Sequence, residues 1–256
     1  MSNTALLVAR GIAFHSTHPR FGHLVPPEAA RLAQGFVAAA RRRIFCGSSP
    51  IDRLIVRAQE RMTVPGLTLH FVLRKRYIEE LVRAAIADGF GRLVVLGAGL
   101  DTLALRLPVR AIEIDHPATQ HLKPGVLGVD LTRDPIPVPH EPAVYLAEGL
   151  FHYLTDAQIR ALLAQMRTIQ SRLIFTFWEP RNPPNFQNAT PVADWWLRRA
   201  GEPGRWTIAP AKLSSFLASE GFSLLHLARD DDYHRRYVSD DVPLAKGEHI
   251  AVACSE

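Results

Sequence analysis

Apolar residues recur at helical spacing through the first 90 residues of the chain. The longest such run covers residues 65–91 and ends at a glycine, with apolar side chains every three or four positions (Leu67, Phe71, Ile78, Leu81, Val82 and Ile86). Two shorter helices are predicted before it. One covers residues 26–47, which begin with prolines and end in glycine, and the other covers residues 49–62, with Ser49 as its N-cap.

From residue 92 onward, short apolar runs alternate with amphipathic segments. Strands are predicted over residues 92–99, 109–115, 125–131, 143–150, 172–179, 223–229 and 249–255, and helices over 101–107, 156–169 and 210–222. This alternation predicts an α/β fold with a mostly parallel seven-stranded sheet and helices on both faces. No helix is expected between the last two strands, whose long connection would leave the final strand antiparallel.

The change of pattern divides the chain into an N-terminal helical cap, residues 1–65, and an α/β domain, residues 66–256. The cap could cover a site or mediate dimerisation. Within the α/β domain, an irregular insertion over about residues 180–209 carries Trp195, Trp196 and Trp206. Long insertions in compact domains are often lids or binding loops, so this segment is a candidate lid.

A glycine turn, Gly97-Ala98-Gly99, ends the first predicted strand and precedes a short helix capped by Asp101 or Thr102. Glycines let the backbone turn tightly and approach a ligand, and ligands of open parallel sheets bind at the carboxyl ends of the strands. A dinucleotide site usually has a third glycine. Here that glycine is absent, and an acid stands where a pyrophosphate would lie. The turn therefore favours a ligand without phosphate, such as S-adenosylmethionine (SAM), over a nicotinamide cofactor.

Acidic residues follow the next three strands. Glu113 and Asp115 end the second strand, and either could accept the two hydroxyls of a ribose. Asp130 ends the third strand and could meet an adenine amine or form a turn. Glu148 ends the fourth strand and could pair with a ligand cation or bond to the backbone. Together these acids predict a nucleoside-like ligand along the edge of the sheet where the carboxyl ends of the strands lie.

The bulk composition narrows the class of partner. The chain has 256 residues, 47% of them hydrophobic, a formal net charge of +5 and two cysteines, Cys46 and Cys254. The densest basic run, Arg41–Arg43, lacks interleaved aromatic residues and is read as a solvated helix face, so no nucleic-acid partner is expected. Apolar runs fall short of the ~20 residues of a membrane span, and no signal peptide is seen. A cytoplasmic protein with reduced cysteines, no membrane partner and no metal site is expected.

The segments VPGLTLHFVLRKRYIEELV, VVLGAGLDTLALRL, EIDHPATQ, GVDL and AEGLFHYLTDAQIRALL together resemble the leucine carboxyl methyltransferase family, in the bacterial branch that acts largely on small molecules. The resemblance covers about residues 64–180. It implies a class I methyltransferase fold, Rossmann-like, that binds SAM as cofactor. The N-terminal region follows the family pattern only loosely, and the chain is short for this branch.

The resemblance also implies roles for residues. By position, Arg74 matches the residue that holds the methionine carboxylate, and Gly97, Ala98 and Gly99 match the turn under the methionine. Asp115 rather than Glu113 matches the acid that binds the ribose. Asp130 and Leu131 match the residues beside the adenine, and Glu148 matches the acid near the methionine end. A guanidinium grips a carboxylate with two parallel bonds, which suits the role given to Arg74.

The function expected is a SAM-dependent O-methyltransferase acting on a carboxylate or hydroxyl of a small molecule, in secondary metabolism. His152, where relatives more often carry an apolar residue, is the candidate base, since a hydroxyl acceptor benefits from one and a carboxylate does not. Candidate walls of the acceptor site are Tyr153, Trp195, Trp196 and Trp206, with core or lid packing as the alternative. The rival functions are a carboxyl methyltransferase of a protein, an NAD-dependent oxidoreductase and a non-catalytic binding subunit. The oligomeric state is open.

Overall fold

The computed structural model describes residues 3–40, 47, 49–119, 123–137, 141–167, 170–239 and 242–255. Arg41–Arg43, Cys46 and most of the end of the helix predicted over residues 26–47 lie outside these ranges. Every helix in the described ranges is too short or too polar to span a bilayer.

Within the described ranges, seven strands form one sheet in the order β3-β2-β1-β4-β5-β7-β6. Their bounds are β1 Arg92–Leu96, β2 Arg110–Asp115, β3 Leu127–Gly128, β4 Ala143–Ala147, β5 Ser171–Trp178, β6 Phe222–Ala228 and β7 Glu248–Ser255. β7 lies between β5 and β6 and is antiparallel to both, whereas the other pairings are parallel. The strand order reverses between β1 and β4, so their carboxyl ends flank the point where such sheets bind ligands.

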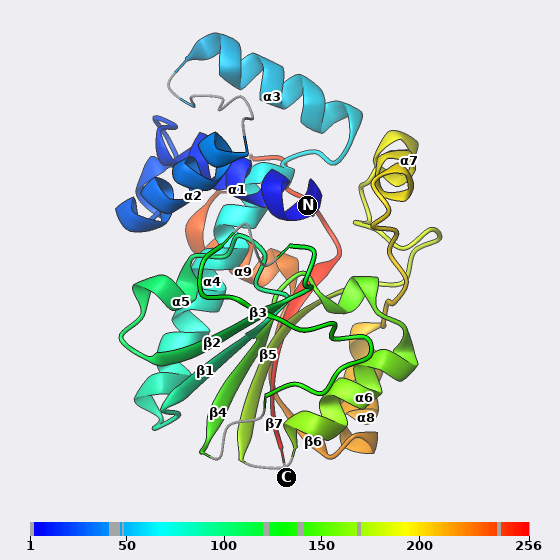
Figure 1. Ribbon diagram of the computed structural model, residues 1–256. Coiled ribbons are helices and arrows are strands. Elements are labelled where there is room, and N and C mark those ends of the chain that lie inside the picture. Colours follow the sequence, from blue (N-terminus) through cyan, green and yellow to red (C-terminus); the bar gives the residue numbers. More distant parts are fainter. Residues whose placement is uncertain are drawn as a thin grey trace.

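Helices cover both faces of the sheet (Figure 1). Successive side chains of a strand point to opposite faces, so the apolar strands need a covering layer on each face. Leu93 and Val95 of β1 pack into the core shared with α4 (Leu67–Ala87), and Val94 and Leu96 pack into the core shared with α6 (Asp156–Met166) and α8 (Pro210–Ser219). α5 (Leu103–Arg106) and α9 (Asp230–Tyr237) lie on the α4 side. The predicted α/β sheet with helices on both faces is confirmed.

The N-terminal helices lie above the carboxyl ends of the strands (Figure 1). They are α1 (Asn3–Ser16), α2 (Pro27–Ala39) and α3 (Pro50–Met62), with a 3-10 turn, η1 (Gly22–Leu24), between the first two. α1 packs on α2 and α4, and Ile12 of α1 belongs to the same core as Leu93 of β1. α7 (Pro191–Arg199), which lies in the predicted insertion, is at the same end of the sheet, across from the N-terminal helices. The backbone N–H groups of Asn3 and Thr4 donate to Glu202, 2.9 and 3.1 Å away, so the start of α1 is tied to the insertion. The domain division at residue 65 stays a prediction.

Three local expectations need correction or refinement. A helix, α9, does connect the last two strands; its sequence DDDYHRRY has no apolar repeat beyond two tyrosines, and it is held by the buried ring of Tyr233. The antiparallel final strand is as expected. The third strand has only two residues instead of seven, because Asp130 turns the chain by accepting hydrogen bonds from Thr132. At α5, Asp101 rather than Thr102 caps the helix, with its Oδ1 2.5 Å from the backbone nitrogen of Leu103.

Candidate functional site

A cavity of about 500 Å³ lies between the carboxyl ends of the strands and the N-terminal helices. Its floor consists of the turn after β1, the segment after β4 and the start of β7. Its walls come from α1, α3, α4 and α7. This volume is in the range of small-molecule sites, and the position matches the reversal of strand order.

The glycine turn forms part of the floor and has the backbone that the sequence predicted. Gly97 and Gly99 have φ angles of 67° and 50°, the left-handed region that favours glycine. A Cβ on Gly97 would lie 3.1 Å from Cδ1 of Leu150, and one on Gly99 would lie 3.2 Å from Cβ of Ala5. Side chains at these positions would therefore crowd the turn, and Ala98 fits between them with its side chain buried.

The two acids of β2 have different environments. Asp115 lines the cavity, and its Oδ2 accepts a hydrogen bond from the backbone N–H of Gly99 at 2.7 Å. Glu113 is buried below it in an ion pair with the equally buried Lys123. The structure therefore leaves Asp115 available to a ligand and uses Glu113 in the core.

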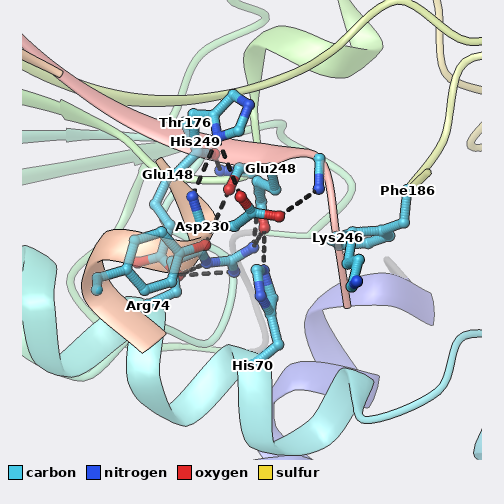
Figure 2. Close-up of polar contacts among 12 residues, drawn as sticks. His70, Arg74, Glu148, Thr176, Phe186, Asp230, Lys246, Glu248 and His249 are labelled. Atoms are coloured by element: carbon cyan, nitrogen blue, oxygen red, sulfur yellow. Dashed lines mark hydrogen bonds and ion pairs between the residues drawn. The ribbon is translucent and has the colours of Figure 1, made fainter. Parts of the chain in front are cut away.

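An ion cluster joins α4 to the ends of β4 and β7 (Figure 2). Arg74, which is buried, donates from Nε and Nη2 to Glu148 Oε1, at 3.0 and 2.7 Å, and from Nη1 to both oxygens of Glu248, at 2.9 and 2.8 Å. Lys75 donates to Glu148 at 3.2 Å and also pairs with Asp101. Two cations thus face three carboxylates beside the cavity, which leaves one net negative charge for a ligand cation.

The local charges shift the pKa values of two of these acids. Burial raises the pKa of Glu248, but the charge of Arg74 and hydrogen bonds from His152 and His70 outweigh it and hold that pKa well below the ordinary range. Burial likewise opposes the charge of Lys75 at Asp101, yet the pKa of Asp101 falls to about 2. Both acids are therefore ionised at neutral pH.

His152 lies in the 3-10 turn η3 (Phe151–Tyr153) directly after β4, and lines the cavity. Its ring stacks on Trp178, with centroids 4.2 Å apart and planes 6° apart. Nε2 lies 3.3 Å from Oε1 of Glu248. Nδ1 is buried and has no hydrogen-bond partner in the part of the chain that the structure describes. Stacking on Trp178 and the contact of Nε2 with Glu248 therefore fix the position of the ring, whereas Nδ1 has no partner among the described residues.

Sequence reasoning missed Glu248, the residue on which this cluster converges. Besides Arg74 and His152, its carboxylate contacts Nε2 of His70 at 2.6 Å, and Nδ1 of His70 lies 3.0 Å from Nε2 of His234 (Figure 2 shows the His70 contact). An acid at the start of a strand is usually solvated, so the pattern gave no signal for it. His70 is a histidine on the apolar face of a helix, which is more often a core residue than a functional one.

The remaining candidates are spread over the fold. Tyr153 and Trp196 line the cavity, whereas Trp195, the next side chain of α7, is 55% exposed and points elsewhere. Trp206 is also outside the cavity: it packs in the core against Phe151. The proposed wall is therefore wrong for Trp195 and Trp206, because the helix turns one away and the insertion buries the other. Trp178, at the end of β5, lines the cavity instead.

Asp130 and Leu131 are not part of the cavity lining either. Asp130 caps its own turn, with Oδ1 2.6 Å from Oγ1 of Thr132, and Leu131 packs against the core on the α6 side. Both follow β3, the strand next to the one that ends in Asp115. They lie beyond Asp115 along the edge of the sheet, so a ligand would have to extend past Asp115 to meet them.

The chain is similar to known methyltransferases. A family model described as leucine carboxyl methyltransferase matches residues 5–135. A proposed SAM-dependent methyltransferase of Streptomyces avermitilis is 31% identical over 160 residues, which are 53% of this chain and 55% of that protein. One of Mycobacteroides abscessus is 28% identical over 191 residues, 65% of this chain and 58% of that protein. The chain thus spans little more than half the length of the curated relatives it matches.

The crystal structure of a proposed methyltransferase of Thermobifida fusca superposes with a TM-score of 0.58 at 15% identity, over 86% of this chain and 93% of that one. The sheet order, the antiparallel β7 and this superposition define a class I methyltransferase fold. With more than half of its residues matched by the family model, the chain belongs to the leucine carboxyl methyltransferase family.

Proposed function

We propose that this protein is a SAM-dependent methyltransferase that methylates a hydroxyl oxygen of an apolar small molecule, with His152 as the base. The observation that carries the hydroxyl assignment is the state of His152. His152 lines the cavity, its Nδ1 is buried without a partner in the described chain, and its Nε2 is held by an ionised carboxylate.

The residues present fit the cofactor. Asp115 would accept the ribose hydroxyls, Asp130 and Leu131 would flank the adenine, and the turn from Gly97 to Gly99 would lie under the methionine half. SAM carries a sulfonium and an ammonium, and the net negative charge of the cluster beside the cavity suits both. When bound, SAM supplies a methyl group that is already activated for displacement.

The contacts of Arg74 add one requirement. A guanidinium has five N–H donors, and four of them are engaged by Glu148 and Glu248. For Arg74 to hold the methionine carboxylate, Glu148 has to give up part of its contact, and the adjacent ammonium offers it a new partner. The two assignments, Arg74 to the carboxylate and Glu148 to the ammonium, therefore depend on one another.

The upper part of the cavity is suited to an apolar acceptor. Its walls are mostly aliphatic and aromatic, and they include Phe14, Val56, Leu67, Phe71, Trp178, Phe186, Trp196 and Leu197. Because such walls exclude water, the acceptor held there, and not water, would receive the methyl group.

The base chemistry follows from the tautomer of His152. An ionised Glu248 can only accept, so Nε2 carries the hydrogen and Nδ1 carries the lone pair. Nδ1 would take the hydroxyl proton as the carbon–oxygen bond forms and the carbon–sulfur bond of the donor breaks, and Glu248 would stabilise the resulting imidazolium. A carboxylate acceptor has no proton to lose at neutral pH and would leave this arrangement unused.

The test is calorimetric titration of the purified protein with SAM, with its demethylated product and with NAD, followed by incubation of extracts with methyl-labelled SAM. We expect binding of SAM and of the product, and a labelled small molecule whose label resists mild base, as an ether does and an ester does not. Binding of NAD alone would support an oxidoreductase. A labelled polypeptide would support a protein substrate, and SAM binding without any labelled product would support a binding subunit.

A further inference from the structure

α3 presents its apolar side to solvent. Ile51, Leu54 and Met62 are 68, 69 and 62% exposed. With Ala58, which is also exposed, they occupy positions i, i+3, i+7 and i+11 and so form one stripe along the helix. A helix that only covered a protein core would turn this stripe inward.

The opposite side of α3 faces the cavity, and it is the more polar one. It contributes Val56, Gln59, Glu60 and Thr63 to the lining. Glu60 also accepts hydrogen bonds from the backbone nitrogen and Oγ1 of Thr68, at 2.8 and 2.7 Å, at the start of α4. These bonds fix the rotation of α3 about its axis, so the outward stripe is a property of the fold.

Positive charge borders the stripe on one side. Arg53, Arg57 and Arg61 follow each other at intervals of four residues, and the last two are exposed. The acids of the helix lie elsewhere: Glu60 faces the cavity, and Asp52 is one turn before the inward Val56. The outer face of α3 is therefore apolar and cationic, which is the composition of a helix that lies in a membrane interface.

We propose that α3 docks this protein on an anionic lipid surface, with the stripe of Ile51, Leu54, Ala58 and Met62 (the outer stripe) inserted among the lipids and the arginines at the head groups. This proposal contradicts the expectation that the chain has no membrane partner, and it concerns a helix lying on the membrane surface, not one that spans the membrane.

A second copy of the chain fits this surface less well. A stable interface buries about 800 Å² on each partner, whereas one face of a 13-residue helix is only about 20 Å long and about 10 Å wide. Pairing two copies of α3 would also bring the arginines of both into one contact. Lipid needs no second protein surface, and its negative charge complements the arginines.

If the protein methylates an apolar acceptor, as we propose, the position of the outer stripe would help the acceptor reach the cavity. The same helix separates the lipid-facing surface from the cavity, and an apolar acceptor would be concentrated in the bilayer. Docking through α3 would place the cavity next to that supply.

The test is co-sedimentation of the full chain with vesicles of phosphatidylcholine, with and without phosphatidylglycerol. We expect binding to the vesicles that contain phosphatidylglycerol, weakened at ~0.5 M salt, and a loss of about tenfold or more in the triple variant I51S/L54S/M62S. The matched control is L105S/L225S, which removes exposed apolar side chains from α5 and β6 and should bind like the parent.

Thermal stabilisation by SAM, measured on every variant, separates this proposal from the proposed function, because the outer-stripe side chains do not line the cavity. A triple variant that still binds SAM but has lost the vesicles supports docking. Equal vesicle binding by the triple variant and the parent would overturn it. A parent protein that does not bind the vesicles would also overturn the proposal. That holds whether α3 instead forms a dimer contact or binds an acidic protein.

Discussion

The imidazole of His152 and the carboxylate of Glu248 meet at the floor of the cavity, with Nε2 3.3 Å from Oε1, although 96 positions separate them in the chain. One follows β4 and the other begins β7, and the two strands flank β5. The sheet therefore brings an ionised acid to one ring nitrogen of His152, and the base that we propose depends on this pairing.

Replacing His152 with glutamine should lower kcat by about 100-fold or more, because an amide cannot take the acceptor proton. SAM affinity should change little. Steady-state kinetics with saturating SAM measure kcat, and calorimetry measures the affinity. The matched control is Y153F: burial raises the pKa of Tyr153 to about 12, so its hydroxyl is no base at neutral pH and the variant should keep its activity. A kcat of H152Q close to that of the parent would contradict the role of His152.

The two acids of β2 should separate binding from stability. We expect D115N to weaken SAM binding by about 10- to 100-fold, the usual worth of a charged hydrogen-bond partner, with little change in the melting temperature. E113Q should do the reverse and cost about 3 kcal/mol of unfolding free energy, because it removes the carboxylate that is paired with buried Lys123. Calorimetry and denaturant unfolding of both variants check this, and the opposite pattern would exchange their roles.

Adjacent tryptophans of α7 offer a similar contrast for the acceptor. W196A removes an aromatic wall of the cavity and should raise the KM of an apolar acceptor by about tenfold, whereas W195A removes an exposed ring and should leave KM unchanged. Steady-state kinetics with the acceptor identified by labelling measure both. Equal effects of the two changes would mean that α7 does not contact the acceptor.

Buried neutral histidines should make the protein sensitive to mild acid. Burial lowers the pKa of His15 and of His234 to about 3, from an ordinary value of 6.5. Between these pH values the unfolded chain binds protons that the native chain does not, so stability falls as pH decreases below about 6.5. The two residues together should remove up to about 2.7 kcal/mol per pH unit. Glu248 and Asp101, with lowered pKa values, lose their contribution only in stronger acid.

Urea unfolding at a series of pH values between 7.5 and 5 tests this slope. H15Q keeps a hydrogen-bonding atom for Thr68 and should reduce the slope by about 1.4 kcal/mol per pH unit. H116Q, at an exposed position, is the control and should not alter it. A parent protein whose stability is flat down to pH 5 would show that these rings are protonated in the folded state.

Much of the fold could be predicted from the chain alone because its strands are short apolar runs and its helices carry caps and apolar repeats. Ser49 and Thr155 cap α3 and α6 as their sequences indicate, and Gly97 and Gly99 have the left-handed backbone that a tight turn requires. Local signals of this kind depend on a few neighbouring residues. α9 has an acidic first turn and a basic last turn but no apolar repeat, and the buried side chain of Tyr233 packs it against the core.

Some residues of the site could likewise be recognised from local sequence, and others only from tertiary contacts. The sequence by itself determined the family, the glycine turn and the candidate acids Asp115 and Glu148, since each follows a recognisable strand. Only the tertiary structure decided that Glu113 pairs with Lys123, that the ring of Trp178 stacks on His152, and that Glu248 contacts Arg74, His70 and His152. These are contacts between distant segments, and they depend on strand order and on burial, which makes an unpaired charge costly and so selects its partner. The outward stripe of α3 was likewise invisible in the sequence, because an amphipathic pattern shows that a helix has two sides but not which side faces the protein.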